Sequence, residues 1–247
     1  MLQQAYPAIE LIIVDGGSTD GSVETIRRYA PRLAYWVCEE DEGPADALNK
    51  GFARATGDIL GFLNADDFLL PGCLEIVADA FLARPDIEVV SGHGFMAKPS
   101  SELGTRIFSD RWDVTRFIYG ACILIQPATF FRRGAFERVG SFDARNRTAW
   151  DAQLWVEMSR AGATFHTIDA SLAVHRIHPS SISGNARLRT QRSRDMSAIQ
   201  RTIRGRCEVP RDRLYSMLYR MRKFSGHPGR TLRQRWFFYS TLGRWSL

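Results

Sequence analysis

Short apolar runs that alternate with helical segments constrain the fold of this chain more than any other feature of its sequence. Ile9–Val14 and Asp58–Leu63 are each followed by a loop rich in Asp, Asn, Gly or Ser, as expected of strands buried in a sheet. Further strands are predicted at Leu33–Val37, Ile87–Ser91, Thr164–Ile168 and Leu172–Ile177. Helices are predicted at Ala45–Ala55, Pro71–Ala83 and Ala149–Ala161, and a further helix, capped by Asp20 or Ser22, continues to about Tyr29. This order predicts an α/β domain with a mixed, mostly parallel sheet flanked by helices.

Charge is distributed unevenly along the chain. The whole sequence has 33 Lys+Arg and 27 Asp+Glu, a formal net charge of +6. Residues 185–247 carry 16 of the basic and 3 of the acidic residues, so their net charge is +13 and that of residues 1–184 is −7. We therefore predict an acidic domain over residues 1–184 and a basic helical extension over residues 185–247, with different partners.

Several classes of protein are disfavoured by the sequence. No apolar run approaches the roughly 20 residues of a membrane-spanning helix, and the first residues lack the pattern of a secretory signal peptide. The four cysteines are far apart in the sequence and form no metal-binding pair. They are typical of free thiols in a reducing compartment, so we expect a cytoplasmic protein.

Acidic loops follow two of the predicted strands, at Asp15–Ser22 and at Asn64–Asp67. In open α/β sheets, ligands bind beyond the carboxyl ends of the strands. Carboxylates placed there can bind a ribose or base, or hold Mg²⁺ or Mn²⁺ together with substrate phosphates. Either loop alone is explained as well by turn formation and helix capping. Their occurrence after two successive sheet strands favours a nucleotide site.

Five ordered segments resemble one known family. They are VDGGSTDGS (14–22), the run from Glu39 to Asp67, IQPATFFRRGAFERVGSFD (125–143), TAWDAQLW (148–155) and HRIHPSSIS (175–183). Together they make residues 5–184 similar to the inverting family 2 glycosyltransferases, which have the Rossmann-like GT-A fold of nucleotide-diphospho-sugar transferases. The resemblance specifies neither the sugar nor the acceptor.

The resemblance implies a donor-binding role for two segments. Asp15 would contact the base or ribose of the nucleotide, and the following helix would line the same pocket. The other residues that it places in this site are Gly17, Ser18, Asp46, Asn49 and Lys50. Leu48 stands where many members have Arg, so a phosphate or base contact from that position is absent.

The resemblance also implies a divalent cation, Mn²⁺ or Mg²⁺. Asp66 would be the ligand of the D-x-D motif, with Asp67 beside it, and Asn64 replaces the first Asp of that motif. Asn can orient a ribose or a water but brings no charge, so weaker metal binding is expected. Arg176 and His178 match a late R-x-H element, in which His178 would complete the metal shell or donate to a phosphate. His175 is explained equally well as a surface residue of a strand.

Asp151 matches the catalytic base of the family. An inverting transfer needs one carboxylate that takes the proton of the acceptor hydroxyl, while the cation and nearby positive charges stabilise the departing diphosphate. Without the surrounding motif, Asp151 would be read as an acid in the first turn of a helix. Gln126 and Trp150 would lie on the acceptor side, where Trp150 could stack on a sugar.

Members of the family begin with a further strand and helix, about thirty residues before the VDGGSTDGS loop. Loss of a central strand would expose backbone hydrogen-bonding groups and apolar surface. We therefore expect Met1 to be an internal residue of a longer protein, encoded upstream of a truncated or misassigned start. If the chain is native as given, we expect it to be inactive or to receive the strand from a partner.

The basic extension allows two interpretations. Arg213–Phe224 mixes apolar and basic residues at helical spacing, and Arg233–Trp245 adds aromatic residues. Such helices either pack on the catalytic domain or lie on an anionic membrane. A nucleic-acid partner is not expected, because no nucleic-acid motif is present and the acidic domain would repel phosphates.

We therefore expect transfer of a sugar, from a UDP-linked donor, to a saccharide or lipid-linked acceptor of cell-envelope polysaccharide synthesis. The alternative outside the enzymes is a catalytically inactive protein that binds nucleotide-sugars or acts as a scaffold. A sugar-phosphate nucleotidyltransferase is a weaker alternative, because its glycine-rich basic loop is absent.

Overall fold

The protein contains two β-sheets in a computed structural model that describes residues 1–98 and 103–232. A small parallel sheet pairs β1 (Ile12–Asp15) with β2 (Tyr35–Cys38). The six-stranded sheet has the order β3-β7-β5-β8-β4, with β6 on β5. Its strands are β3 (Ile59–Leu60), β4 (Phe68–Leu69), β5 (Val89–Ala97), β6 (Thr105–Ile107), β7 (Thr129–Arg132) and β8 (Phe165–Arg176).

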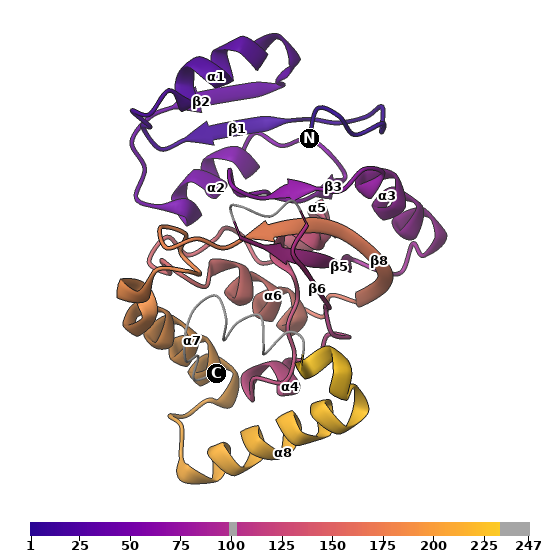
Figure 1. The fold of residues 1–247 in the computed structure, drawn as a ribbon, viewed down its shortest axis with the longest axis vertical. Coiled ribbons are helices and arrows are strands. Elements are labelled where there is room, and N and C mark those ends of the chain that lie inside the picture. Colours follow the sequence, from indigo (N-terminus) through magenta and orange to yellow (C-terminus); the bar gives the residue numbers. More distant parts are fainter. Residues whose placement is uncertain (99–102, 233–247) are drawn as a thin grey trace.

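Eight α-helices surround these sheets in the described part of the chain. They are α1 (Ser22–Tyr29), α2 (Pro44–Phe52), α3 (Cys73–Ala83), α4 (Val114–Ile118), α5 (Arg133–Glu137), α6 (Trp150–Arg160), α7 (Arg189–Arg204) and α8 (Pro210–Gly226). Figure 1 shows α1, β1 and β2 at one end of the molecule and α8 at the opposite end. None of the described helices combines the length and the apolar character that a membrane-spanning helix needs.

The α/β class and the mixed sheet agree with the sequence, but two details differ. Antiparallel pairings outnumber parallel ones: only β1–β2 and β5–β8 are parallel among the described strands. An apolar run indicates that a strand is buried on both faces of the sheet, but it does not indicate the direction of the strand. The two strands predicted within 164–177 form the single strand β8, whose pairing with β5 shifts register near His93.

The two sheets are not joined by backbone pairing between β1 and β3 over the described residues. A side chain bridges them instead. The Glu10 carboxylate accepts hydrogen bonds from the backbone N–H groups of Thr56 (2.7 Å) and Gly57 (3.2 Å), just before β3. These bonds lower the pKa of Glu10, and that of Thr56 is the largest contribution. The expectation of a further strand and helix before residue 1 stays a prediction.

Apolar side chains fill the space between the sheets and the helices. Phe131 on β7 is fully buried against the rings of Phe52, Phe136 and Trp155. Another buried cluster joins α7 to the body, because Ile199 packs there with residues of α4 and α6. The first long helix of the basic extension is therefore docked on the domain, and a boundary at residue 184 stays a prediction.

Candidate active site

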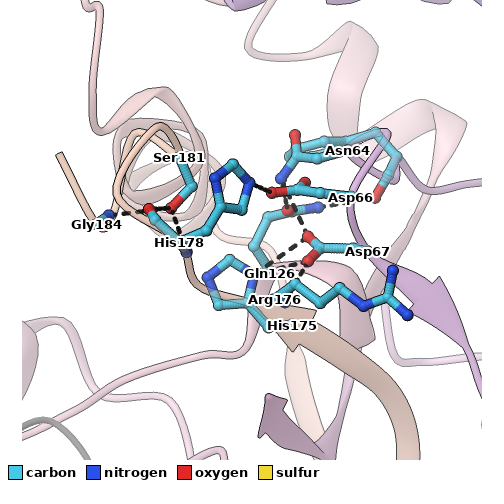
Figure 2. A network of polar contacts seen from close by, with 10 residues as sticks. Asn64, Asp66, Asp67, Gln126, His175, Arg176, His178, Ser181 and Gly184 are labelled. Carbon is cyan, nitrogen blue, oxygen red and sulfur yellow. Dashed lines mark hydrogen bonds and ion pairs between the residues drawn. The ribbon is translucent and has the colours of Figure 1, made fainter. Parts of the chain in front are cut away.

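Antiparallel pairing of β4 with β8 brings two motifs together that are more than 100 residues apart. Phe68 lies opposite Val174, so the two aspartates that precede β4 meet the end of β8 and the loop after it. Figure 2 shows the polar network that results, which also includes Asn64 and Gln126. The sheet register thus assembles the predicted D-x-D and R-x-H segments at one place.

Asp67 is bonded entirely within the protein. Both oxygens of its buried carboxylate lie 3.1 Å from His175 Nδ1. The carboxylate also accepts a hydrogen bond from the backbone N–H of Arg176 at 2.8 Å. Asn64 Nδ2 donates to it as well, at 3.2 Å. Burial acts to lower the pKa of His175, but the carboxylates of Asp67, Asp66 and Asp151 together outweigh it, so this pKa is raised. Asp67 therefore anchors the end of β8.

Asp66 and His178 form the accessible pair of the network. Asp66 Oδ2 lies 3.0 Å from His178 Nε2, and about a third of each side chain is exposed (32% and 30%). The Ser181 hydroxyl fixes the loop that carries His178, since it donates to the His178 carbonyl at 2.8 Å and accepts from Gly184 N at 3.1 Å. One carboxylate oxygen and one imidazole nitrogen thus face the same space (Figure 2).

Gln126 and Arg176 support this arrangement from the sides. Gln126 Nε2 donates to the Phe62 carbonyl at 2.7 Å, and its Oε1 accepts from Asn64 Nδ2 at 3.1 Å. The guanidinium of Arg176 lies over the Phe68 ring, 5.1 Å from its centroid. In Figure 2 it reaches away from His178. Gln126 therefore positions the side chain of Asn64. The guanidinium of Arg176 does not face the Asp66–His178 pair.

Asp151 stands in the first turn of α6 and is coupled electrostatically to this network. Burial raises the pKa of its carboxyl above the ordinary value for Asp. The backbone N–H of Ala152 and the positive charges of His175 and Arg192 oppose that rise. A carboxylate held in this way is a stronger proton acceptor than an exposed one, which suits a general base.

Arg192 on α7 is a site residue that the sequence did not suggest. Its guanidinium donates to the carbonyl of Ser183 at 3.2 Å and to that of Ile182, in the loop that follows His178. It also acts on Asp151 through its charge. The basic extension therefore contributes directly to the surroundings of the catalytic candidate, and no local motif around Arg192 signals this role.

The predicted donor loop is built on Asp15 at the end of β1. Asp15 Oδ1 accepts hydrogen bonds from Gly17 N (3.1 Å), Ser18 N (2.8 Å) and Cys38 Sγ (3.1 Å). Burial acts to raise the pKa of Asp15, but the bonds from Ser18, Cys38 and Gly17 together lower it. Gly17 has a φ of 91°, which favours glycine at this turn. The loop presents an ionised carboxylate beside exposed backbone.

Residues of α2 predicted to bind the donor make contacts inside the protein. Lys50 Nζ pairs with Glu39 (2.9 Å) and with Asp46 (3.3 Å). Asn49 bridges to the backbone of Phe142: its Nδ2 donates to the Phe142 carbonyl and its Oδ1 accepts from the Phe142 N–H, both at 2.8 Å. The amide of Asn49 is thus committed to the fold, and a donor contact from it stays a prediction.

Trp150 is a core residue. It is 7% exposed and packs in the cluster that contains Leu60, Phe131 and Trp155. Its ring offers no open face to a sugar, so we leave Trp150 out of the proposed sugar-binding surface. Neighbouring residues of a helix project about 100° apart, so Trp150 can pack in the interior while Asp151 interacts electrostatically with His175.

A divalent cation fits the exposed pair better than the aspartate pair. Asp66 and His178 could supply an oxygen and a nitrogen ligand, and phosphates of a substrate could supply others. Asp67 is bonded to His175, and its side chain is fully buried. Among the described residues, no group of three or more His, Cys, Asp and Glu is arranged as a complete metal site.

Residues 1–140 match the family model described as Glycosyl transferase family 2. A PGL/p-HBAD biosynthesis glycosyltransferase from Mycobacterium bovis is 33% identical over 155 residues, which are 60% of this chain and 58% of that protein. An uncharacterized glycosyltransferase from Nostoc sp. is 27% identical over 188 residues, 72% of this chain and 58% of that protein. The chain thus spans somewhat more than half the length of these curated relatives.

Solved structures agree in fold. The Pyrobaculum calidifontis mannosyltransferase PcManGT, in complex with GDP-Man and Mn²⁺, matches with a TM-score of 0.61 at 22% identity, over 99% of this chain and 70% of that chain. Residues 1–349 of S. aureus TarS with UDP-GlcNAc match with a TM-score of 0.64 at 14% identity, over 91% of this chain and 66% of that chain. At these identities the likeness establishes the fold, which is GT-A.

Proposed function

The chain belongs to glycosyltransferase family 2, and on that basis we propose that it transfers a sugar from a nucleotide-diphosphate donor to an acceptor with inversion. The observation that carries the proposal is the Asp66–His178 pair, assembled by the β4–β8 register and coupled through His175 to Asp151. A cation-binding pair next to a proton acceptor is what a direct displacement at a sugar phosphate requires.

Asp151 is the proposed base. Its carboxylate takes the proton from the acceptor hydroxyl as the oxygen attacks the anomeric carbon, and the bond to the nucleotide diphosphate breaks on the opposite side. The raised pKa of Asp151 supports this role, since it makes the carboxylate a better proton acceptor near neutral pH. His175, held by Asp67, fixes the end of β8, and the neighbouring carboxylates raise its pKa, which favours the protonated form.

Asp66 and His178 are the proposed ligands of Mn²⁺ or Mg²⁺. A cation held there would supply positive charge to the leaving diphosphate. The Mn²⁺ complex of PcManGT supports the use of a divalent cation in this fold. Asp15 and the backbone of Gly17 and Ser18 are proposed to bind the nucleotide, and the UDP-GlcNAc complex of TarS supports a UDP-linked donor.

The acceptor is proposed to be a saccharide or a lipid-linked saccharide of the cell envelope. The biosynthetic role in the name of the mycobacterial relative supports a glycolipid or polysaccharide pathway. We propose a cytoplasmic location at the inner face of the plasma membrane. The free thiols of Cys38, Cys73, Cys122 and Cys207 and the net charge of the extension support it.

Nucleotide release from a panel of UDP- and GDP-sugars in Mn²⁺ tests the proposal. We expect nucleotide release that is abolished by a chelator. The variant Asp151→Asn should lower its rate about 10²–10⁴-fold. Asp66→Asn should raise the Mn²⁺ concentration needed for half-maximal rate. Asp79→Asn, an exposed acid on α3, is the matched control and should leave both unchanged. Release that survives Asp151→Asn would rule out the proposed base, and no release with any donor would favour an inactive binding protein.

A further inference from the structure

Helix α8 docks on the body through its polar side. The buried Asp212 carboxylate accepts hydrogen bonds from Arg206 Nη1 (2.7 Å) and Nη2 (2.9 Å). Further along the helix, Ser216 donates to the Tyr119 carbonyl at 2.9 Å, and the Tyr219 ring stacks on that of Tyr119 with centroids 5.4 Å apart. Lys223 then pairs with Asp110. Polar contacts at both ends and in the middle of α8 thus hold it in one orientation.

The opposite side of α8 is apolar and faces solvent. Leu214, Met217, Leu218 and Met221 follow the i, i+3, i+4, i+7 spacing of one helix face, and each is at least half exposed (50–57%). A surface helix normally buries its apolar stripe and exposes its polar side. In α8 the two sides are reversed, and Figure 1 shows the helix at the outer end of the molecule. We call these four residues the α8 apolar face.

Exposed arginines border this face on both sides. At 3.6 residues per turn, Arg211 and Arg222 lie along one edge and Arg213 along the other. The helix carries five Lys+Arg and a single acid, Asp212, which is neutralised by Arg206. Long arginine side chains can lie along an apolar surface while their charged ends stay in a polar layer.

We propose that the α8 apolar face inserts into the interfacial region of a bilayer that contains anionic lipids, with the bordering arginines on the headgroup phosphates. An apolar stripe between two rows of cations is the arrangement of a helix that lies in a membrane interface. A second copy of the chain is a poorer occupant, because it would bring the two arginine rows together. This inference rests on the membrane location proposed above and names the helix face that contacts the lipid. Binding to vesicles requires no transfer of sugar, so its failure is distinguishable from failure of the proposed activity.

Vesicle flotation with the full chain tests the inference. The probes are vesicles of phosphatidylcholine alone and of phosphatidylcholine mixed with phosphatidylglycerol. We expect binding to the mixed vesicles that weakens at high salt, because screening reduces the attraction of arginine to phosphate. The double variant Met217→Ser/Leu218→Ser should bind about 100-fold more weakly, since it removes two inserted side chains. The double variant Arg211→Gln/Arg222→Gln should bind more weakly, by about tenfold or more.

Leu82→Ser is the matched control. Leu82 is an apolar residue of α3 that is 76% exposed, so its substitution removes exposed apolar surface away from α8 and should leave vesicle binding unchanged. All variants are at exposed positions and should melt like the unmodified chain. Equal flotation of the unmodified chain and Met217→Ser/Leu218→Ser would overturn the inference. So would flotation that is lost only when residues 233–247 are deleted, or a dimer in solution that Met217→Ser/Leu218→Ser dissociates.

Discussion

Substitution of Asn49 by Ala offers a sharp test of what this side chain does. The N–H and the oxygen of its side-chain amide both form hydrogen bonds to the backbone of Phe142, 93 residues along the chain, with N···O distances of 2.8 Å. Phe142 is 4% exposed, so its N–H and carbonyl would lose their partners in a place that water reaches poorly. Each unsatisfied backbone group costs about 1–3 kcal/mol.

The expected loss of unfolding free energy is about 1.5–3.5 kcal/mol. Two groups at the lower half of that range give about 2–4 kcal/mol, and the higher helix propensity of Ala offsets roughly 0.5 kcal/mol within α2. For a chain of this size, that loss corresponds to a drop in melting temperature of about 5–10 °C. Thermal and urea denaturation followed by circular dichroism measure both quantities, and Asn49→Ala should retain the KM for the donor.

Lys50→Ala is the matched control, because it lies next to Asn49 on the same helix. Its ion pairs with Glu39 and Asp46 are partly exposed, and such pairs contribute little to stability. We expect this variant to melt close to the unmodified protein. If Asn49→Ala also melted normally but raised the KM for the donor several-fold, the structural role of Asn49 would be refuted and the donor contact supported.

Three further outcomes are expected. Phe131→Ala should lower the unfolding free energy by about 3–5 kcal/mol, because its fully buried ring leaves a cavity beside Trp155, whereas Phe131→Leu should cost less; urea denaturation measures both. In pH profiles, kcat/KM should fall as pH drops through the raised pKa of Asp151, since the base acts only when deprotonated. Arg192→Gln should move this acid limb to higher pH, because loss of the nearby positive charge raises the pKa of Asp151 further.

Most of the secondary structure could be predicted from local patterns. The helices at α2, α3 and α6 begin or end within a few residues of their predicted limits, because proline, glycine and apolar periodicity mark them. Strand β8 was divided in the prediction because Asp169 and Ser171 interrupt its apolar pattern. Asp169 is exposed and lies in the irregular stretch between Thr167 and Ser171, where the register shifts before pairing with β5 continues. Strand continuity here depends on a neighbour that the local sequence does not reveal.

The site could be predicted only as far as its motifs extend. Asp66, His178 and Asp151 were identified from segments with a known arrangement, and the structure brings Asp66 and His178 within 3.0 Å. The partner of Asp67 could not be predicted, because it depends on the register between β4 and β8. Arg192 likewise depends on how α7 docks. Contacts between distant elements are set by packing, which a pattern along one segment does not report.

The two consecutive aspartates show why a motif and a binding site are different things. Asp66 lies in the turn before β4 and Asp67 directly precedes that strand, and their carboxylates contact different histidines. Asp67 meets His175 and the Arg176 backbone, and this contact sets the position of the strand end from which the His178 loop continues. Asp66 then meets His178 on the accessible side. The exposed pair therefore depends on the buried aspartate. Without the Asp67 contacts, the distance between Asp66 and His178 would no longer be fixed. The two aspartates therefore differ in what they contact: Asp67 anchors the end of β8, and Asp66 is the one that we propose as a cation ligand.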